Sequence, residues 1–376
     1  MWRVRWPALP WPEHHVASPH REIRPRTPVA LRVGALGLLG VLLLVAGMGS
    51  LVLRLGDLLV PRTEIRAIEQ RDHEPPPPEP DASAAPAVTG ITNVLVVGLD
   101  SRTGLTDEQL LALGTEDVGT HLTDTVMWVQ VDADADEIRM VSFPRDLRVE
   151  PSPGARPVKL NALHNIGGPD LLVSTLEGFV GADLDHYVEI DLAGFLRLAD
   201  AVGGVQVCLS NPMVDVDAGV DLPPGCQLLD ATDAAGYVRA RQVSDEFGVG
   251  TAGRAMRQQY YIRQAVRKVV SAGTLTNPSR LRAMVGVARD SVVVDEGFST
   301  SELLRFADRF RAFDSARMDG ATVPVRGARV DGLYYDLLTD ESEAVFTALR
   351  EGAGLGALAD ADEPDVSASA AGTGSP

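Results

Sequence analysis

Lysine is almost absent from this sequence. Of its 34 basic residues only Lys159 and Lys268 are lysines, and its 52 acidic residues give a net charge of −18. Residues 1–60 carry an excess of four positive charges, whereas the remainder carries an excess of 22 negative charges. A body this acidic binds the nucleic-acid backbone poorly, because that backbone requires a positive surface. We therefore expect no nucleic-acid partner, and we interpret clustered arginines as a local site.

The sequence also lacks the motifs of several common enzyme classes. It contains no Walker or Rossmann glycine pattern, and Ser101 does not lie in a G-x-S-x-G context. The histidines His121, His164 and His186 are not spaced as metal ligands, and no Cys/His zinc pattern is present. These absences argue against a P-loop, a dinucleotide site, a nucleophile-elbow hydrolase and a zinc centre.

Charge is missing from one long stretch near the start of the chain. The 21 residues from Val33 to Leu53 are apolar or small, which is long enough to cross a bilayer as a helix. Several arginines precede them, which favours a cytoplasmic N-terminus. A cleaved signal peptide is the alternative, but no small-residue cleavage site clearly follows. We predict a single-pass anchor in the cell membrane, with everything after residue 54 extracytoplasmic.

Only two cysteines are present. Cys208 and Cys226 are 18 positions apart and flank a loop rich in Pro, Gly and Asp. They could be buried free thiols or a disulfide. Because an extracytoplasmic compartment is oxidising, we favour the disulfide.

Composition divides the chain into segments. Residues 75–78 are four consecutive prolines, which are typical of a semi-rigid spacer. The predicted segments are a disordered cytoplasmic segment (1–32), the membrane helix (33–53), a juxtamembrane segment with a proline-rich linker (54–90), one extracytoplasmic domain (91–354) and a disordered tail (355–376).

Apolar runs and turn residues predict the elements of that domain. The expected strands are 93–97, 125–131, 137–143, 187–190, 205–209 and 321–325. The expected helices are 160–166, 169–180, 192–202, 231–239, 254–270, 280–287, 299–310 and 340–350. Strands alternating with helices predict the α/β class, with a mixed central sheet flanked by helices.

Cations gather between residues 237 and 258, on both sides of a loop that contains three glycines. Thr251 is a candidate N-cap for the helix that follows. A helix start with forked guanidinium groups near it is suited to a phosphate or pyrophosphate. The alternative is a solvated helix face. The side chains are Arg239 and Arg241 before the loop and Arg254, Arg257 and Gln258 after it.

Two aspartates lie at the ends of the first two predicted strands. Asp100 lies at the exit of the first strand, and Asp124 opens the next. If those strands are neighbours, the carboxylates converge at one edge and suit Mg²⁺, which shares phosphate oxygens. The alternative is that both are turn or cap residues. Arg145 adds a guanidinium at another strand end, although it could instead pair with Asp146.

These motifs resemble, in order, those of the LytR–CpsA–Psr family of cell-envelope glycopolymer ligases. The resemblance covers most of residues 91–270, and a single N-terminal span before a large outer domain is similar too. The matching pieces are NVLVVGLDSR (93–102), LTDTVMWVQVD (122–132), VSFPRDLRVE (141–150), KLNALHNIGGPDLLVSTLEGFVG (159–181), HYVEIDLAGFLRLADAVGGVQV (186–207), LDATDAAGYVRAR and GRAMRQQ.

The resemblance implies roles for named residues. It implies a magnesium site at Asp100 and Asp124, with Mn²⁺ as an alternative ion, and makes Asp124 a candidate proton acceptor. It implies that an apolar tunnel between sheet and helices holds a lipid chain, for which Leu171, Leu172, Leu176 and Phe179 are candidates. The pyrophosphate-binding and catalytic set that it implies is Arg145, Arg239, Arg241 and Arg254, with Arg257 and Gln258 beside them.

The activity implied by the resemblance is transfer of a glycopolymer from a polyprenyl-pyrophosphate carrier to peptidoglycan. Two other functions stay open at this point. Water could replace the acceptor, which would make the protein a lipid-pyrophosphate hydrolase. The chain could also be a non-enzymatic envelope regulator, although nothing in it resembles a DNA-reading helix. The sequence does not name the polymer.

Overall fold

The computed structural model describes residues 61–73, 90–116, 122–132, 134–152, 154–243, 247–248, 250–271, 287, 291–299 and 317–356. The predicted membrane helix at 33–53, the N-terminal segment and most of the predicted tail lie outside these residues, as do the predicted helix at 299–310 and nearly all of that at 280–287. None of the helices in the described ranges is both long and apolar enough to span a bilayer.

The described elements follow the chain in this order: β1 (Arg62–Thr63), α2 (Arg66–His73), β2 (Ile91–Leu99), α3 (Asp107–Ala112), β3 (Thr123–Asp132), β4 (Glu137–Ser142), β5 (Arg148–Val149), β6 (Val158–Lys159), the 3-10 helix η1 (Leu160–Ala162), α4 (Leu163–Val180), β7 (His186–Asp191), α5 (Leu192–Val202), β8 (Val205–Leu209), β9 (Met213–Asp215), β10 (Val220–Leu222), β11 (Gly225–Leu229), α6 (Ala231–Arg239), α7 (Gly250–Ser271), β12 (Val292–Asp295), β13 (Met318–Thr322), β14 (Val325–Val330), β15 (Leu333–Leu338) and α10 (Ser342–Glu351).

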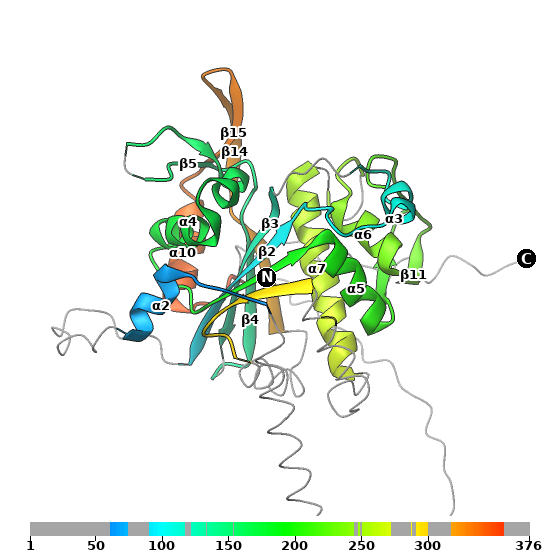
Figure 1. Ribbon diagram of the computed structural model, residues 1–376, viewed down its shortest axis with the longest axis horizontal. Coiled ribbons are helices and arrows are strands. Elements are labelled where there is room, and N and C mark those ends of the chain that lie inside the picture. The colour runs from blue at the N-terminus through cyan, green and yellow to red at the C-terminus, as the bar shows by residue number, and fades with distance from the viewer. Residues whose placement is uncertain are drawn as a thin grey trace, which may run out of the picture. The chain divides into compact units, whose positions relative to one another are not determined.

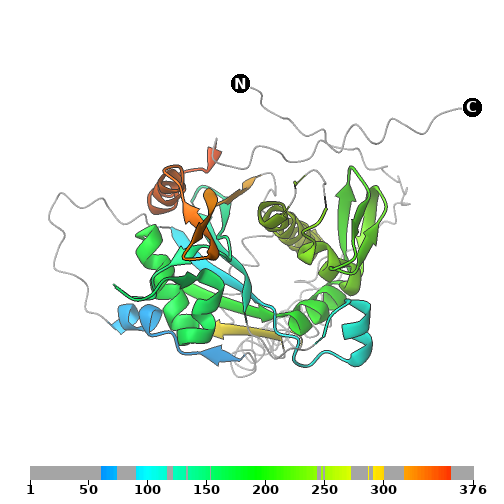
Figure 2. The same ribbon diagram turned by 90° about the horizontal axis from the view of Figure 1, so that it is seen from above.

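A seven-stranded sheet lies at the centre, in the order β1-β12-β7-β2-β3-β4-β13. Three of its strand pairs are parallel (β1/β12, β2/β7 and β4/β13) and the other three are antiparallel. Helices α2, α4 and α10 lie on one side, and α5 and α7 lie on the other (Figures 1 and 2). The predicted mixed sheet flanked by helices is therefore confirmed.

Alternation of side chains along the strands builds a core on each face of the sheet. On one face, Leu95, Val97 and Trp128 pack with buried residues of α4 such as Leu172 and Leu176. Their strand neighbours point to the opposite face. There, Met127, Val131, Ile138, Met140 and Met318 form a second cluster, with Ile262 of α7 against it.

A smaller layer packs beside the sheet, where β8 to β11 join α6 and α7 around a third cluster that includes Val207, Tyr237 and Tyr261. Aspartates define the helix starts here: Asp191 accepts from the backbone N–H of Gly194 at the start of α5, and Asp230 caps α6 in the same way. These caps explain why α5 and α6 begin where the sequence predicts.

Several boundaries differ from prediction. Helix α7 begins at Gly250, so Thr251 lies within the helix and the predicted N-cap is wrong. The sequence predicts a strand at 321–325, whereas β13 ends at Thr322 and Val325 already belongs to the hairpin β14–β15. We did not predict β12 or this hairpin, because residues 271–350 were expected to be mainly helical.

The sequence predicts a domain that starts at residue 91, and the structure adds earlier residues to the same fold. Strand β1 pairs with β12 at the edge of the central sheet. Ile65 and Ile68 are buried in the same core as Leu95. Part of the range predicted as juxtamembrane is therefore built into the folded unit.

Candidate active site

Asp100 and Asp124 meet at one end of the central sheet. Strands β2 and β3 are antiparallel neighbours, so the end of one adjoins the start of the other. The backbone N–H of Asp100 donates to the carbonyl of Leu122 at 2.9 Å. The two residues therefore lie at the same end of the sheet, where the charge of Asp124 acts on the carboxyl of Asp100.

Three arginines from three separate parts of the chain reach the carboxylate of Asp124. Arg145, which follows β4, lies 2.6 Å from it, and Arg241, which follows α6, lies at 2.9 Å. Arg254 in the first turns of α7 lies at 3.5 Å and also donates to the Asp124 carbonyl at 3.3 Å. The structure thus brings one arginine from each predicted group, Arg241 and Arg254, together with Arg145 to a single aspartate.

The two aspartates have opposite electrostatic environments. Burial acts to raise the pKa of Asp124, but Arg254, then Arg145 and Arg241, outweigh it, so the pKa is lowered. Burial raises the pKa of Asp100, and the charge of Asp124 raises it further against the opposing effect of Arg102. Asp124 is therefore held in its ionised form, whereas Asp100 has too little positive charge around it to offset its burial and the charge of Asp124.

Burial also disfavours the cations. Arg254 is 3% exposed, and its pKa is lowered to about 10, chiefly by burial and also by Arg241 and Arg145, against the attraction of Asp124. Burial likewise lowers the pKa of Arg239, opposed by Asp100. Mutually repelling cations with too few carboxylates are stabilised by an added anion. Five guanidinium groups lie around Asp100 and Asp124, and Asp146 (3.7 Å from Arg145) and Asp215 offset part of their charge; the five are Arg102, Arg145, Arg239, Arg241 and Arg254.

Arg239 is placed differently from the other predicted arginines. Its guanidinium donates to the backbone carbonyls of Leu113 and Ala218, at 2.7 and 2.8 Å. It nevertheless lies close enough to Asp100 and Arg241 for their charges to act on its pKa, which Asp100 raises and Arg241 lowers. Arg239 therefore faces the site and also ties α6 to two neighbouring segments.

Arg257 and Gln258 do not contact the two aspartates in the described structure. Arg257 is fully buried and donates to the carbonyls of Ala240 (2.6 Å) and Gly248 (3.3 Å). Gln258 donates to the carbonyl of Val238 at 3.1 Å. Arg257 therefore holds both ends of the loop between α6 and α7, and Gln258 binds the last turn of α6.

Two residues of the site escaped prediction. Arg102 donates to Asp100 at 3.1 Å, and only its place two residues after Asp100 could have indicated this. Asp215 accepts the backbone N–H groups of Arg241 and Gln242 at 2.7 and 2.8 Å. Burial acts to raise the pKa of Asp215, but these backbone donors outweigh it and lower the pKa. No local motif marks Asp215, since its partners lie 26 and 27 residues away.

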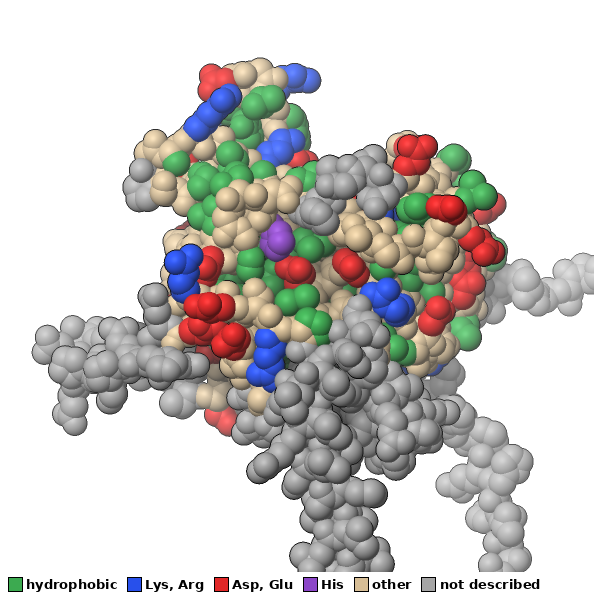
Figure 3. Space-filling view, viewed as in Figure 1, with side chains coloured by type: hydrophobic (Ala, Val, Ile, Leu, Met, Phe, Trp, Pro, Cys, Tyr) green, Lys and Arg blue, Asp and Glu red, His purple; other side chains and the backbone are tan. Residues whose placement is uncertain are grey.

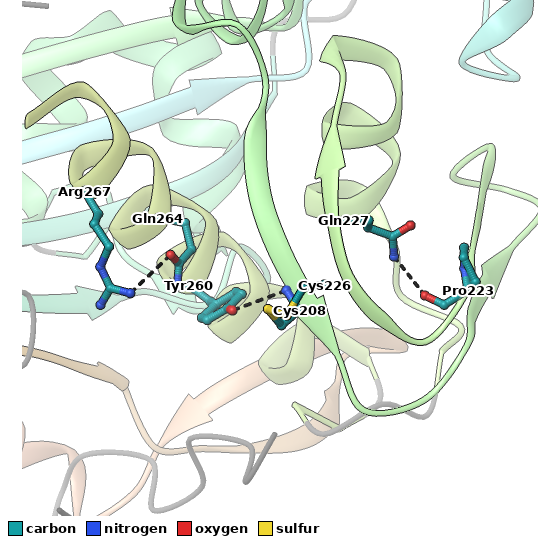
Figure 4. Close-up of a disulfide and its surroundings, with 7 residues drawn as sticks. All are labelled: Cys208, Pro223, Cys226, Gln227, Tyr260, Gln264 and Arg267. Atoms are coloured by element: carbon teal, nitrogen blue, oxygen red, sulfur yellow. Dashed lines mark hydrogen bonds between the residues drawn. A yellow bond between two sulfur atoms is a disulfide. The ribbon is translucent and has the colours of Figure 1, made fainter. Parts of the chain in front are cut away.

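The predicted disulfide is present. Cys208 in β8 and Cys226 in β11 lie directly opposite each other across the strand pair and are bonded. The backbone N–H of Cys208 donates to the hydroxyl of Tyr260 in α7 at 3.4 Å (Figure 4). The disulfide therefore links β8 to β11, and the Tyr260 hydrogen bond joins β8 to α7, the helix that carries Arg254.

The four candidate tunnel residues lie along α4. Leu172 and Leu176 are fully buried in the main core, and Leu171 and Phe179 are partly buried against it. Helix α4 is broken at Gly168, which adopts a φ of 68° that only glycine adopts readily. The helical segment that carries the four residues begins at Pro169, after this break.

The donor set at the two aspartates fits a small divalent cation. Carboxylate oxygens are the ligands that Mg²⁺ prefers, and a cation would offset both causes of the raised pKa of Asp100, its burial and then the like charge of Asp124. Among the described residues no group of three or more His, Cys, Asp or Glu side chains could hold a metal alone. Phosphate oxygens and water would have to complete the shell, as is usual for Mg²⁺.

Comparisons with known proteins agree with this fold. A family model described as the LytR_cpsA_psr family matches residues 63–351. A relative from Corynebacterium glutamicum, the "Probable cell wall biosynthesis protein LcpB", is 37% identical over 275 residues, which cover 72% of this chain and 64% of that protein. The chain thus spans less than two thirds of the length of that relative.

Two further matches extend the comparison. The "Polyisoprenyl-teichoic acid--peptidoglycan teichoic acid transferase TagU" of Halalkalibacterium halodurans is 26% identical, over 67% of this chain and 75% of that protein. The solved "LytR-Csp2A-Psr enzyme from Actinomyces oris" is 19% identical with a TM-score of 0.55, over 77% of this chain and 94% of that one. The structural match shows that the fold is shared.

Proposed function

The chain belongs to the LytR_cpsA_psr family, and on that premise we propose that it transfers a glycopolymer from a polyprenyl-pyrophosphate carrier to peptidoglycan. The observation that carries this proposal is the meeting of Arg145, Arg241 and Arg254 on Asp124, next to Asp100. The name of the TagU relative supports it, since that protein is called a transferase of teichoic acid to peptidoglycan.

The chemistry needs charge neutralisation more than it needs a covalent nucleophile. A hydroxyl of the acceptor sugar attacks the phosphorus that carries the glycopolymer. A new P–O bond forms, the bridging P–O bond of the pyrophosphate breaks, and polyprenyl phosphate leaves with the bonding pair. The arginines stabilise the charge that develops on the departing phosphate, and the hydroxyl proton passes to a carboxylate, for which Asp124 is our candidate.

Asp100 and Asp124 would hold Mg²⁺, with Mn²⁺ as an alternative. Such an ion supplies positive charge to the pyrophosphate oxygens. The arginines contribute the fixed part of the same field. Arg254 already bears a strong desolvation penalty, so a bound pyrophosphate would relieve the repulsion among Arg254, Arg145 and Arg241.

We also propose that the enzyme works outside the cytoplasm, attached by a helix formed from residues 33–53. The disulfide between Cys208 and Cys226 supports this placement, because such bonds persist in oxidising compartments. Its partners are then the lipid-linked glycopolymer and the peptidoglycan acceptor.

The test uses the full chain in detergent with a synthetic polyprenyl-pyrophosphate oligosaccharide, Mg²⁺ and uncross-linked peptidoglycan. We expect labelled oligosaccharide on the peptidoglycan, polyprenyl phosphate as the second product, and loss of both with Arg145→Ala or Arg254→Ala. Free sugar phosphate without transfer would make the protein a hydrolase. If neither product forms in any metal, the enzymatic proposal fails and a scaffold or regulator takes its place.

A further inference from the structure

The hairpin β14–β15 projects from the body of the described fold (Figure 1). Its two strands are joined by Asp331 and Gly332, both with positive φ (52° and 82°), as a tight two-residue hairpin turn requires. The space-filling view shows basic, acidic and hydrophobic side chains together on this projecting end (Figure 3). The exposed residues of the hairpin include Arg326, Arg329, Leu333 and Tyr334.

The ring of Tyr334 lies across the backbone of the neighbouring strand. A Cβ atom at Gly327 would come 2.3 Å from the Tyr334 hydroxyl and 2.9 Å from Cζ. Glycine at this position therefore leaves the space that the ring occupies. Tyr334 is 48% exposed in this position, so one part of the ring is supported by the hairpin and another part faces solvent.

Polar groups lie beside this ring on the same face of the hairpin. The hydroxyl of Tyr334 donates to Asp336 Oδ1 at 3.2 Å. Arg329 is paired with Tyr334 across the two strands, and Gly327 is paired with Asp336. The Asp336 carboxylate raises the pKa of Tyr334, which keeps its hydroxyl protonated as a donor. An exposed aromatic surface with adjoining carboxylate and guanidinium groups combines apolar contact with hydrogen bonding.

The same residues connect the hairpin to the arginine site. The backbone N–H of Asp336 donates to the carbonyl of Asp146 at 2.9 Å, and the backbones of Asp336 and Leu147 form an isolated parallel β-bridge. Asp146 follows Arg145, whose guanidinium contacts Asp124. A ligand group on Tyr334 would therefore lie close to a phosphate held by Arg145, along a continuous backbone connection.

We propose that Tyr334, Asp336 and Arg329 form a saccharide subsite that holds a sugar ring of the peptidoglycan acceptor, an assignment that rests on the proposed function. The C–H face of a pyranose packs on the exposed ring of Tyr334, Asp336, which is buried, positions that ring through the Tyr334 hydroxyl, and Arg329 faces the carboxylates that peptidoglycan carries.

The charge of the hairpin favours the acceptor as the occupant. Arg326 and Arg329 are exposed on it, and peptidoglycan carries carboxylates that guanidinium groups bind. The backbone contact between Asp336 and Asp146 joins this surface to the segment that carries Arg145, beside the phosphate that the acceptor hydroxyl attacks in the proposed reaction.

The test measures binding of the full chain in detergent to insoluble, uncross-linked peptidoglycan, together with acceptor KM in the transfer assay. We expect Tyr334→Ala to weaken peptidoglycan binding and to raise acceptor KM by at least about tenfold, with kcat and donor KM little changed. Gly327→Ala displaces the ring without removing it and should give a similar loss. Tyr334→Phe keeps the ring and should stay within about threefold of wild type.

Leu333→Ala is the matched control, because Leu333 is as exposed as its neighbour Tyr334 (50%) but points to the other face of the hairpin. Thermal unfolding of each variant confirms that it folds. Wild-type binding by Tyr334→Ala, or an equal loss with Leu333→Ala, would overturn the subsite. A rise in donor KM alone would overturn its assignment to the acceptor.

Failure of the proposed function gives a different pattern. If the wild type transfers nothing but Tyr334→Ala still loses peptidoglycan binding, the transfer proposal fails and the saccharide subsite stands. If transfer is normal and acceptor KM is unchanged in Tyr334→Ala, only the subsite falls.

Discussion

Replacing each of the two site aspartates by asparagine should change stability in opposite directions. Asp124 accepts from three arginines at 2.6, 2.9 and 3.5 Å and keeps 23% of its side chain exposed. Hydrogen bonds to charged groups contribute about 1.5–3 kcal/mol each. Residual exposure and the one bond that asparagine can still accept reduce the sum, so we expect Asp124→Asn to destabilise by about 2–4 kcal/mol.

Asp100→Asn should be neutral or stabilising. Asp100 has one ion pair, with Arg102 at 3.1 Å, and is otherwise disfavoured by burial and by the charge of Asp124. Removing its charge relieves both, and the asparagine oxygen can still accept from Arg102, so we expect a gain of up to about 1 kcal/mol. For a domain of this size, Asp124→Asn should lower the Tm by about 5–15 °C and Asp100→Asn should raise it by up to about 4 °C.

The pH dependence of the pair follows from the directions of the two pKa shifts. The pKa of Asp124 is lowered, so its stabilisation is present above the ordinary carboxyl pKa and is lost as pH falls through the folded-state value. The pKa of Asp100 is raised, so its favourable contribution is present below the ordinary pKa and is lost as pH rises through the folded-state value. The gain from Asp100→Asn should therefore appear only as pH rises.

The assay is thermal unfolding of the full chain in detergent, for wild type and both variants, from pH 4 to pH 7 at low salt and without divalent cations. Equal destabilisation by the two substitutions at pH 7 would refute this reasoning, since it would mean that the two carboxylates have equivalent surroundings.

Three further predictions concern the surrounding side chains. Arg254→Met should stabilise the protein by about 1–2 kcal/mol, which is part of the roughly 3 kcal/mol that corresponds to a pKa lowered to about 10. The same substitution should lower the transfer rate at least about 100-fold. The control is Arg66→Met, which should change neither stability nor transfer, because the Arg66 side chain is 72% exposed. Arg257→Met should destabilise by about 2–3 kcal/mol, because the carbonyls of Ala240 and Gly248 lose their donor; faster proteolysis between α6 and α7 checks this, and an unchanged cleavage rate would contradict it. Cys208→Ser with Cys226→Ser should cost about 3 kcal/mol, seen as a lower Tm that matches the reduced wild type; no difference from the oxidised protein would count against it.

Where local signals were strong, the sequence predicted the fold closely. Helix α5 and strand β8 have the predicted bounds, because Asp191 caps the helix start and Gly203 ends it with a positive φ of 75°. The break at Gly167 and Gly168 was predicted for the same kind of reason.

Elements that depend on distant pairing were missed. Strand β12 lies between β1 and β7, and its short run from Val292 to Asp295 has no turn signal that indicates this place. The hairpin β14–β15 did have a signal, since Asp331-Gly332 between alternating apolar residues is typical of a two-residue turn. The elements expected from the sequence nevertheless include no strands between residues 326 and 339.

The site shows the same division between local and distant information. Their spacing of three and four residues puts Arg254, Arg257 and Gln258 on one face of a helix. In the structure their partners are backbone carbonyls of Asp124, Ala240 and Val238, respectively. Only Arg254 reaches Asp124, because one helical turn further along, Arg257 meets backbone carbonyls of the folded loop. Which arginine meets the anion is decided by that loop, and a sequence pattern does not give its path.

The central claim is that this cluster binds a diphosphate and breaks its bridging bond. Phosphorus-31 NMR of a polyprenyl-pyrophosphate oligosaccharide, incubated with the full chain, Mg²⁺ and peptidoglycan, tests it most directly. We predict that the two pyrophosphate resonances are replaced by one phosphodiester and one phosphomonoester, with wild type but not with Arg145→Ala. Pyrophosphate resonances that persist unchanged with the wild type, under conditions where peptidoglycan binds, would contradict the claim.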